Sequence, residues 1–129
     1  MFNTILFPLD RSQESQSAAQ LVANLVNHHE SSLVLLSVVP EDAKTTGEFD
    51  AIAKMLEQAK DAFSQQNITA EIIERSGMPA FVICDVADEV SAELIVMGCR
   101  GLGLTQEGAT DSVTNRVISL APCPVLVAT

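Results

Sequence analysis

The stretch LIVMGCRGLGLTQEGATDS, residues 94–112, decides how the rest of the sequence is interpreted. It opens with an apolar run that predicts a buried strand, and Gly98, Gly101 and Gly103 follow in close succession. Backbone N–H groups in a glycine-rich turn after such a strand can surround a phosphate group. The same stretch carries Glu107 and Asp111, whose negative charges oppose a bound phosphate. It therefore predicts an anion site and contains a reason for that site to be weak.

Outward from this stretch, short apolar runs alternate with helical patterns along the whole chain. The predicted strands span residues 4–9, 32–39, 68–75, 93–97 and 122–128. The predicted helices span residues 11–30, 49–66 and 113–120, and one more begins at Pro79. Strands that alternate with helices of this length imply right-handed crossovers and a parallel sheet. We therefore expect an α/β fold over residues 1–129, a single doubly wound domain whose five-stranded parallel sheet has helices on both faces.

Apolar residues at helical spacing indicate which face of each predicted helix is buried. In the first helix these residues are Ala18, Ala19, Leu21, Val22, Leu25 and Val26, and in the second Ile52, Met55, Leu56, Ala59 and Phe63. In the helix that begins at Pro79 they are Phe81, Val82, Cys84, Val86, Ala87 and Val90.

The composition argues against several classes of protein. The formal net charge of −10, with seven scattered Lys and Arg residues and neither Trp nor Tyr, does not fit a nucleic-acid-binding surface. No apolar run approaches the roughly 20 residues that span a membrane. The N-terminus shows no export signal, and Cys84, Cys99 and Cys123 are odd in number and have neither CxxC nor metal-ligand spacing. These features predict a reduced, cytoplasmic protein that binds neither nucleic acid nor membrane.

In open parallel sheets, ligands bind beyond the carboxyl ends of the strands, where the strand order reverses. Asp10 follows the first predicted strand, Val38 lies near the end of the second, and Gly98 follows the fourth. A carboxylate at Asp10 suits a ribose or an adenine amine, and the backbone of Val38 suits an adenine edge. The alternatives stay open at this point, because Asp10 could simply begin a turn and Val38 could belong only to the core.

The start of the last predicted helix is a second candidate for anion binding. Ser112 and Thr114 are placed there, where free N–H groups and hydroxyls can face a phosphate. Ser112 could equally serve as a plain N-cap. The chain has no GxxxxGK[ST] sequence and no GxGxxG after its first strand, so neither common phosphate-binding pattern applies.

The sequence resembles the universal stress protein family over nearly the whole chain, most clearly in four segments. They are ILFPLDRS, LVLLSVVP, SGMPAFVICDVADEVSAELIVMGCRGLG and SVTNRVISLAPCPVLVAT. The resemblance implies a small α/β domain of the adenine nucleotide alpha hydrolase-like type. It also implies a homodimer formed through the C-terminal strand, residues about 122–129. Many members of the family bind ATP or another adenine nucleotide, whereas another branch does not bind ATP.

The nucleotide-binding members share a G-x2-G-x9-G-[ST] pattern, which this chain matches in part. Gly98 and Gly101 match the first two glycines, Asp111 stands at the third, and Ser112 matches the last position. The resemblance, together with the positions at the strand ends, predicts a set of nucleotide-binding residues. They are Pro8, Leu9, Asp10, Val38, Met97, Gly98, Arg100, Gly101, Ser112, Val113 and Thr114.

Asp111 puts the phosphate end of this site in question. At about 4–5 Å and an effective dielectric constant near 20, one pair of like charges costs roughly 3–4 kcal/mol before screening. Three outcomes stay open: a divalent cation such as Mg²⁺ bridges Asp111 and the phosphate, only a less charged nucleotide binds, or the site is empty. The leading hypothesis is a stress-response protein that binds AMP or ADP more readily than ATP.

Two other classes of function are compatible with the sequence. One is a dimeric interaction or regulatory module of the same family that binds no nucleotide, and the other is a weak ATPase. No residue is a convincing general base, because His28 and His29 lie at the end of the first predicted helix. We therefore predict no catalytic residue and no metal ligand.

Overall fold

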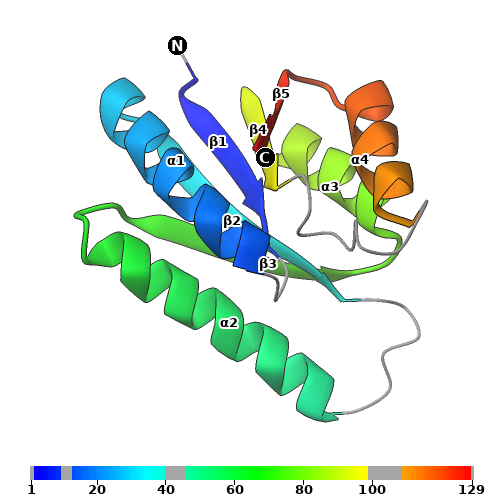
Figure 1. Cartoon of the computed structure of the whole chain (residues 1–129), viewed down its shortest axis with the longest axis horizontal. Helices are drawn as coiled ribbons and strands as arrows, with labels where there is room; N and C mark the ends of the chain where they lie inside the picture. Colours follow the sequence, from blue (N-terminus) through cyan, green and yellow to red (C-terminus); the bar gives the residue numbers. More distant parts are fainter. Residues whose placement is uncertain (1, 10–12, 40–45, 99–108, 129) are drawn as a thin grey trace.

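The computed structural model describes residues 2–9, 13–39, 46–98 and 109–128 of the chain (Figure 1). Its strands are β1 (Thr4–Pro8), β2 (Ser32–Val39), β3 (Ala70–Ser76), β4 (Leu94–Gly98) and β5 (Val125–Ala128). Its helices are α1 (Gln13–His29), α2 (Thr46–Ser64), α3 (Pro79–Glu89) and α4 (Ala109–Leu120). Helices and strands alternate from β1 to β5, as the sequence predicts.

The strands form one parallel sheet in the order β3-β2-β1-β4-β5. From β1 the chain moves to β2 and β3 on one side, and then returns past β1 to β4 and β5. Because right-handed crossovers in opposite directions place their helices on opposite faces, α1 and α2 cover one face and α3 and α4 the other (Figure 1). The expected doubly wound, five-stranded parallel fold is confirmed, and the strand order reverses between β1 and β4.

Side chains of the central strands alternate between the two faces. On β1, Phe7 packs on the α1/α2 side and Leu6 on the α3/α4 side. On β4, Val96 packs on the α1/α2 side and Met97 on the α3/α4 side. Apart from Thr4 at the start of β1, these two strands are apolar throughout because both of their faces are covered.

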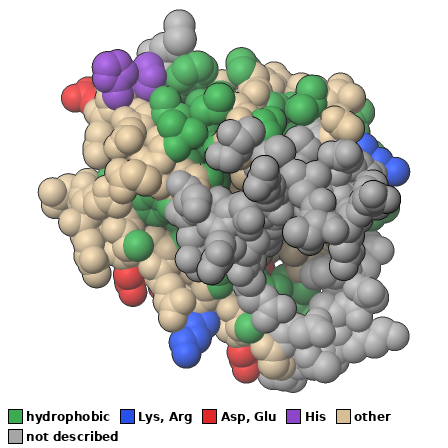
Figure 2. Space-filling model, in the orientation of Figure 1, with side chains coloured by type: hydrophobic (Ala, Val, Ile, Leu, Met, Phe, Trp, Pro, Cys, Tyr) green, Lys and Arg blue, Asp and Glu red, His purple; other side chains and the backbone are tan. Residues whose placement is uncertain are grey.

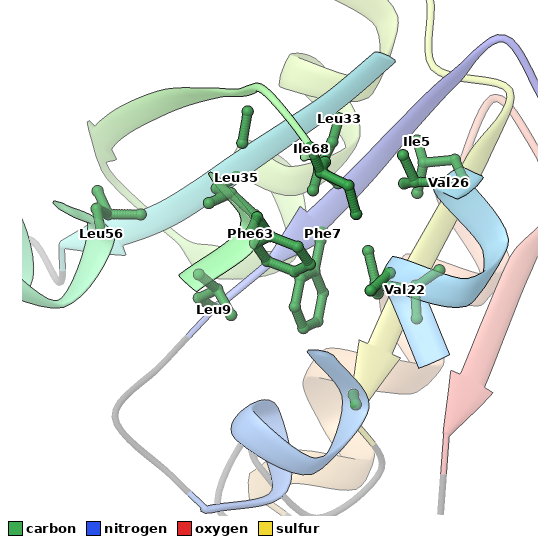
Figure 3. Packing of buried hydrophobic residues seen from close by; sticks show 14 of the residues in the cluster. Ile5, Phe7, Leu9, Val22, Val26, Leu33, Leu35, Leu56, Phe63 and Ile68 are labelled. Carbon is green, nitrogen blue, oxygen red and sulfur yellow. The ribbon is translucent and has the colours of Figure 1, made fainter. Parts of the chain in front are cut away.

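The α1/α2 side holds the larger part of the core. Phe7 of β1 and Phe63 of α2 meet edge to face, with ring centroids 6.4 Å apart and planes at 87° (Figure 3). Val22 and Val26 bring α1 against the same layer, and Leu56 adds to it from α2. The buried faces predicted for α1 and α2 are thus largely confirmed, although Leu21 is 36% exposed.

The face predicted for α3 is partly wrong. Val86 and Ala87 are buried as expected, but Phe81 is 47% exposed, and Ile83, which the prediction omits, is only 1% exposed. Because nearly every residue between 80 and 87 is apolar, more than one helical stripe fits this segment. The observed buried set, completed by Ala80, is the one that faces the sheet.

Three boundaries differ from the prediction by three residues or more. α2 begins at Thr46 and α4 at Ala109, three and four residues before the predicted starts at Phe49 and Val113. In both helices the first turn is polar, so the apolar stripe begins after the helix does. β5 is confined to Val125–Ala128, because Pro122 and Pro124 have no N–H to donate to a ladder.

Candidate nucleotide site

A cavity of about 200 Å³ opens at the carboxyl edge of the sheet, on the α3/α4 side. Among the described residues, the sheet side of the cavity is lined from β1, β2 and the residue that follows β1, and the helix side is lined from α3 and α4. The lining residues are Pro8, Leu9, Leu36, Val38, Pro79, Ile83 and Val113. The cavity lies next to the point where the strand order reverses, which is where ligands bind in sheets of this type.

The structure brings four of the predicted site residues together around this cavity. Pro8 ends β1 and Leu9 follows it, Val38 is near the end of β2, and Val113 is in the second turn of α4. Val38 and Val113 are both partly buried against the α3/α4 part of the core. Val38 and Val113, which are 75 positions apart in the sequence, therefore line the same small apolar cavity.

The peptide groups at the end of β1 are held from both sides. The Leu9 N–H donates to the Leu36 carbonyl at 2.7 Å, and the Ser37 hydroxyl donates to the Leu9 carbonyl at 3.3 Å. Ser37 is 3% exposed, and this bond satisfies a hydroxyl that would be costly to bury alone. These bonds fix the backbone at the residue that precedes Asp10, which itself lies outside the described residues.

The predicted phosphate end of the site is described only in part. Met97 and Gly98 complete β4, both are buried, and Gly98 is paired with Ala128. Arg100 and Gly101 lie outside the described residues. The described strand β4 therefore delivers the chain to the carboxyl edge beside β1, where the glycine-rich segment begins.

The early start of α4 changes the position of the predicted hydroxyl residues. Position 111 is the third residue of the helix, Ser112 the fourth and Thr114 the sixth. The free N–H groups of a helix belong to its first turn, so the N-cap role considered for Ser112 is wrong. The side chains of Ser112 and Thr114 lie outside the described residues.

The sequence prediction missed three of the lining residues, Leu36, Pro79 and Ile83. Pro79 carried only a signal for the start of a helix, and Leu36 reads as ordinary core. Ile83 lies one turn after Pro79 and shares its side of α3, which a correct assignment of the buried stripe of α3 would have revealed.

The described lining of the cavity is apolar and carries no titratable side chain.

His28 and His29 lie in the last turn of α1, at the upper left in Figure 2, at the end of the molecule where β1 starts. The His29 ring meets that of Phe2 with centroids 5.3 Å apart, close to the amino edge of the sheet. Within the described part of the chain, no three His, Cys, Asp or Glu residues gather as a metal site would require. The apolar lining of the cavity is suited to binding a flat, largely apolar group.

Two described thiols lie on the α3/α4 side of the sheet. Burial raises the pKa of Cys84, and the neighbouring Asp85 carboxylate raises it further. The pKa of Cys123 is raised by burial and then by Cys84. Both groups therefore stay protonated near neutral pH, where a thiol is a weak nucleophile.

No helix among the described residues has the length and hydropathy to cross a membrane.

The whole chain, residues 1–129, matches the model of the universal stress protein family. It is 60% identical over 134 aligned residues to universal stress protein Sll1654 of Synechocystis sp., an alignment that covers 98% of this chain and 85% of that protein. The fold is similar to that of an Archaeoglobus fulgidus universal stress protein in complex with dAMP, with a TM-score of 0.82 and 20% identity over 99% and 98% of the two chains. It is also similar to a universal stress protein in complex with cAMP, with a TM-score of 0.81 and 22% identity over 99% and 97%. The chain belongs to the universal stress protein family.

Proposed function

We propose that this protein binds an adenine nucleotide at the carboxyl edge of its sheet. The observation that carries the proposal is the apolar cavity walled by Pro8, Leu9, Val38 and Val113, four positions chosen from the sequence for this role. The dAMP and cAMP complexes of two proteins with this fold support an adenine nucleotide as the ligand.

The size of the cavity indicates which part of a nucleotide enters it. Its volume of about 200 Å³ is below the roughly 300–1,000 Å³ typical of pockets that hold a whole small molecule. A flat base suits this space, with Val38 and Ile83 contributing apolar surface from β2 and α3. The ribose and phosphates then extend along the carboxyl edge toward Gly98 and the glycine-rich segment that follows it.

The first turn of α4 favours nucleotides with fewer phosphate charges. A helix N-terminus attracts anions, and a carboxylate in the first turn already gains roughly 0.3–1 kcal/mol there. Asp111 is in that turn, so its charge competes with a phosphate for the same positive end of the helix. We infer that AMP and ADP bind more tightly than ATP, and that Mg²⁺ narrows the difference by shielding the extra charge.

Calorimetric titration with AMP, ADP and ATP, with and without Mg²⁺, tests this function. Val38→Phe fills the cavity and should lower AMP affinity at least tenfold. Ile72→Phe, at a partly buried position on the opposite face of the sheet, is the matched control and should leave it unchanged. If no nucleotide produces heat with the unmodified protein, the proposal is wrong, and an interaction module without a nucleotide becomes the better description.

We further propose that two chains pair through β5. This edge strand has the sequence VLVA with no charge, and Leu126 is 37% exposed. The opposite edge, β3, carries exposed Glu71, Glu74 and Arg75, which discourage pairing with another strand. Leu126→Lys should convert a dimer to a monomer in sedimentation velocity, while Ile73→Lys at the β3 edge should not. A Leu126→Lys protein that keeps the wild-type sedimentation coefficient would place any interface elsewhere.

A further inference from the structure

A second hollow lies on the other side of the sheet, between α1 and α2. It has a volume of about 360 Å³, within the range of small-molecule pockets. α1 packs over β4 and α2 packs over β2 and β3, so that β1 forms the floor between the two helices. The lining residues are Phe7, Leu9, Ala19, Gln20, Met55, Gln58, Ala59, Ala62, Phe63 and Gln66.

The floor of this hollow is closed and apolar. Phe7 and Phe63 meet there edge to face and are 0% and 3% exposed, and Leu9 lies beside them (Figure 3). Met55 and Ala59 form the wall on the α2 side and are only partly buried. A ligand in this space would bury apolar surface against a floor that is already packed, at roughly 25 cal/mol for each Å² removed from water.

The described rim of the hollow is polar but uncharged. It carries the side chains of three glutamines, Gln20, Gln58 and Gln66, all exposed. Of these, Gln20 already donates from Nε2 to Asn24 at 3.0 Å, which leaves its carbonyl oxygen to accept another bond. In a chain with 24 charged residues and a net charge of −10, no described lining residue is charged. The described part of the rim, uncharged and above an apolar floor, favours a neutral ligand, because a charged ligand would lose its hydration without gaining a partner among these residues.

We propose that the hollow between α1 and α2 is a binding site for a small neutral molecule with an apolar ring system and one hydroxyl or amide group. The ring packs against the partly buried Met55 and Ala59, above the floor of Phe7 and Phe63, and the polar group bonds to the rim glutamines. This site is on the opposite face from the nucleotide cavity and does not depend on the nucleotide proposal. Leu9 lines both spaces, so it is the point at which the two sites come closest in the chain.

The test is an NMR titration of the full chain with naphthol, which is neutral at pH 7 and carries one hydroxyl. We expect saturable shifts at Met55, Ala59 and Phe63. Naphthalene sulfonate, which keeps the ring but has a charged sulfonate in place of the hydroxyl, should bind at least tenfold more weakly. If naphthol produces no saturable shift, or if the sulfonate binds as tightly, the proposal is overturned.

Variants locate the site independently. Ala59→Phe fills the hollow from α2 and should lower naphthol affinity at least tenfold, whereas Ala53→Phe, on the exposed face of the same helix, should leave it unchanged. Ala62→Leu is a milder filling change at an exposed rim position and should lower the affinity several-fold even if Ala59→Phe does not fold. Equal naphthol affinity in the Ala62→Leu and Ala53→Phe proteins would overturn the assignment.

Discussion

The two faces of the sheet are built differently. The α1/α2 face has helices of 17 and 19 residues and the aromatic pair Phe7–Phe63, whereas the α3/α4 face has helices of 11 and 12 residues. The buried helical residues of the α3/α4 face are alanine, valine and isoleucine, with no aromatic ring, and this face holds both described thiols. Longer helices and larger side chains bury more apolar surface, so most of the stability should come from the α1/α2 face.

The largest expected effect tests this division of stability. Phe63→Ala removes a ring from the α1/α2 core and should lower the free energy of unfolding by about 3–5 kcal/mol. Val86→Ala, an equally buried position on α3, removes two methyl groups and should cost roughly 2 kcal/mol. Urea denaturation measures both through the shift in midpoint at constant slope. Equal losses would mean that the two faces contribute alike.

The same contrast explains which features could be predicted from the sequence. Apolar strands and amphipathic helices are local patterns, so the order of elements and the buried stripe of α2 were predictable from residues such as Ile52, Leu56 and Phe63. The stripe of α3 was not, because its apolar residues are nearly continuous and Phe81 and Ile83 fit different registers equally well. Helix starts were missed where the first turn is polar, as at Ala109.

The sites divide in a similar way. That Pro8, Leu9 and Val38 would line one space was predictable, because strand ends meet at one edge of a parallel sheet. The contributions of Pro79 and Ile83 depend on how α3 lies over that edge, which no local pattern encodes. The hollow between α1 and α2 has no signal in the sequence, since Met55 and Ala59 read as core until the separation of the two helices is known.

A second prediction separates the two faces by their ligands. Asp111→Gly removes a carboxylate from the first turn of α4 and should tighten ATP binding at least tenfold; the upper limit before screening is the few hundredfold that roughly 3–4 kcal/mol corresponds to. Naphthol binding on the α1/α2 face should not change. Calorimetry measures both ligands on one preparation.

Asp111→Asn separates the effect of the charge on ATP affinity from the effect of the side-chain atoms. It removes the charge but keeps the Cβ, so an improvement similar to that of Asp111→Gly would assign the effect to charge. An improvement seen only with glycine would assign it to close approach of the backbone. Unchanged ATP affinity in both variants would mean that residue 111 is remote from the phosphates.

The smallest expected effect concerns pH and belongs to the α3/α4 face alone. Burial raises the pKa values of Cys84 and Cys123 above the ordinary 9.0, and none of the buried residues described on the α1/α2 face is a cysteine. When the folded-state pKa of a thiol is raised, its contribution to stability is complete below the unfolded pKa and is lost as the pH rises through the folded value. The free energy of unfolding should therefore decline above about pH 9.

The Cys84→Ser, Cys123→Ser double variant removes this decline. It should be less stable than the unmodified protein near pH 7, because hydroxyls replace partly buried thiols, but its stability should change less between pH 8 and 10. The chain has no tyrosine, so few other groups titrate in this interval. Urea midpoints at several pH values give the two slopes, and Cys99 is kept in both proteins so that it contributes equally. If the urea midpoints of the two proteins change in parallel with pH, the thiols of the α3/α4 face titrate as they do in the unfolded chain. This face would then be more open to water at Cys84 and Cys123 than their burial indicates.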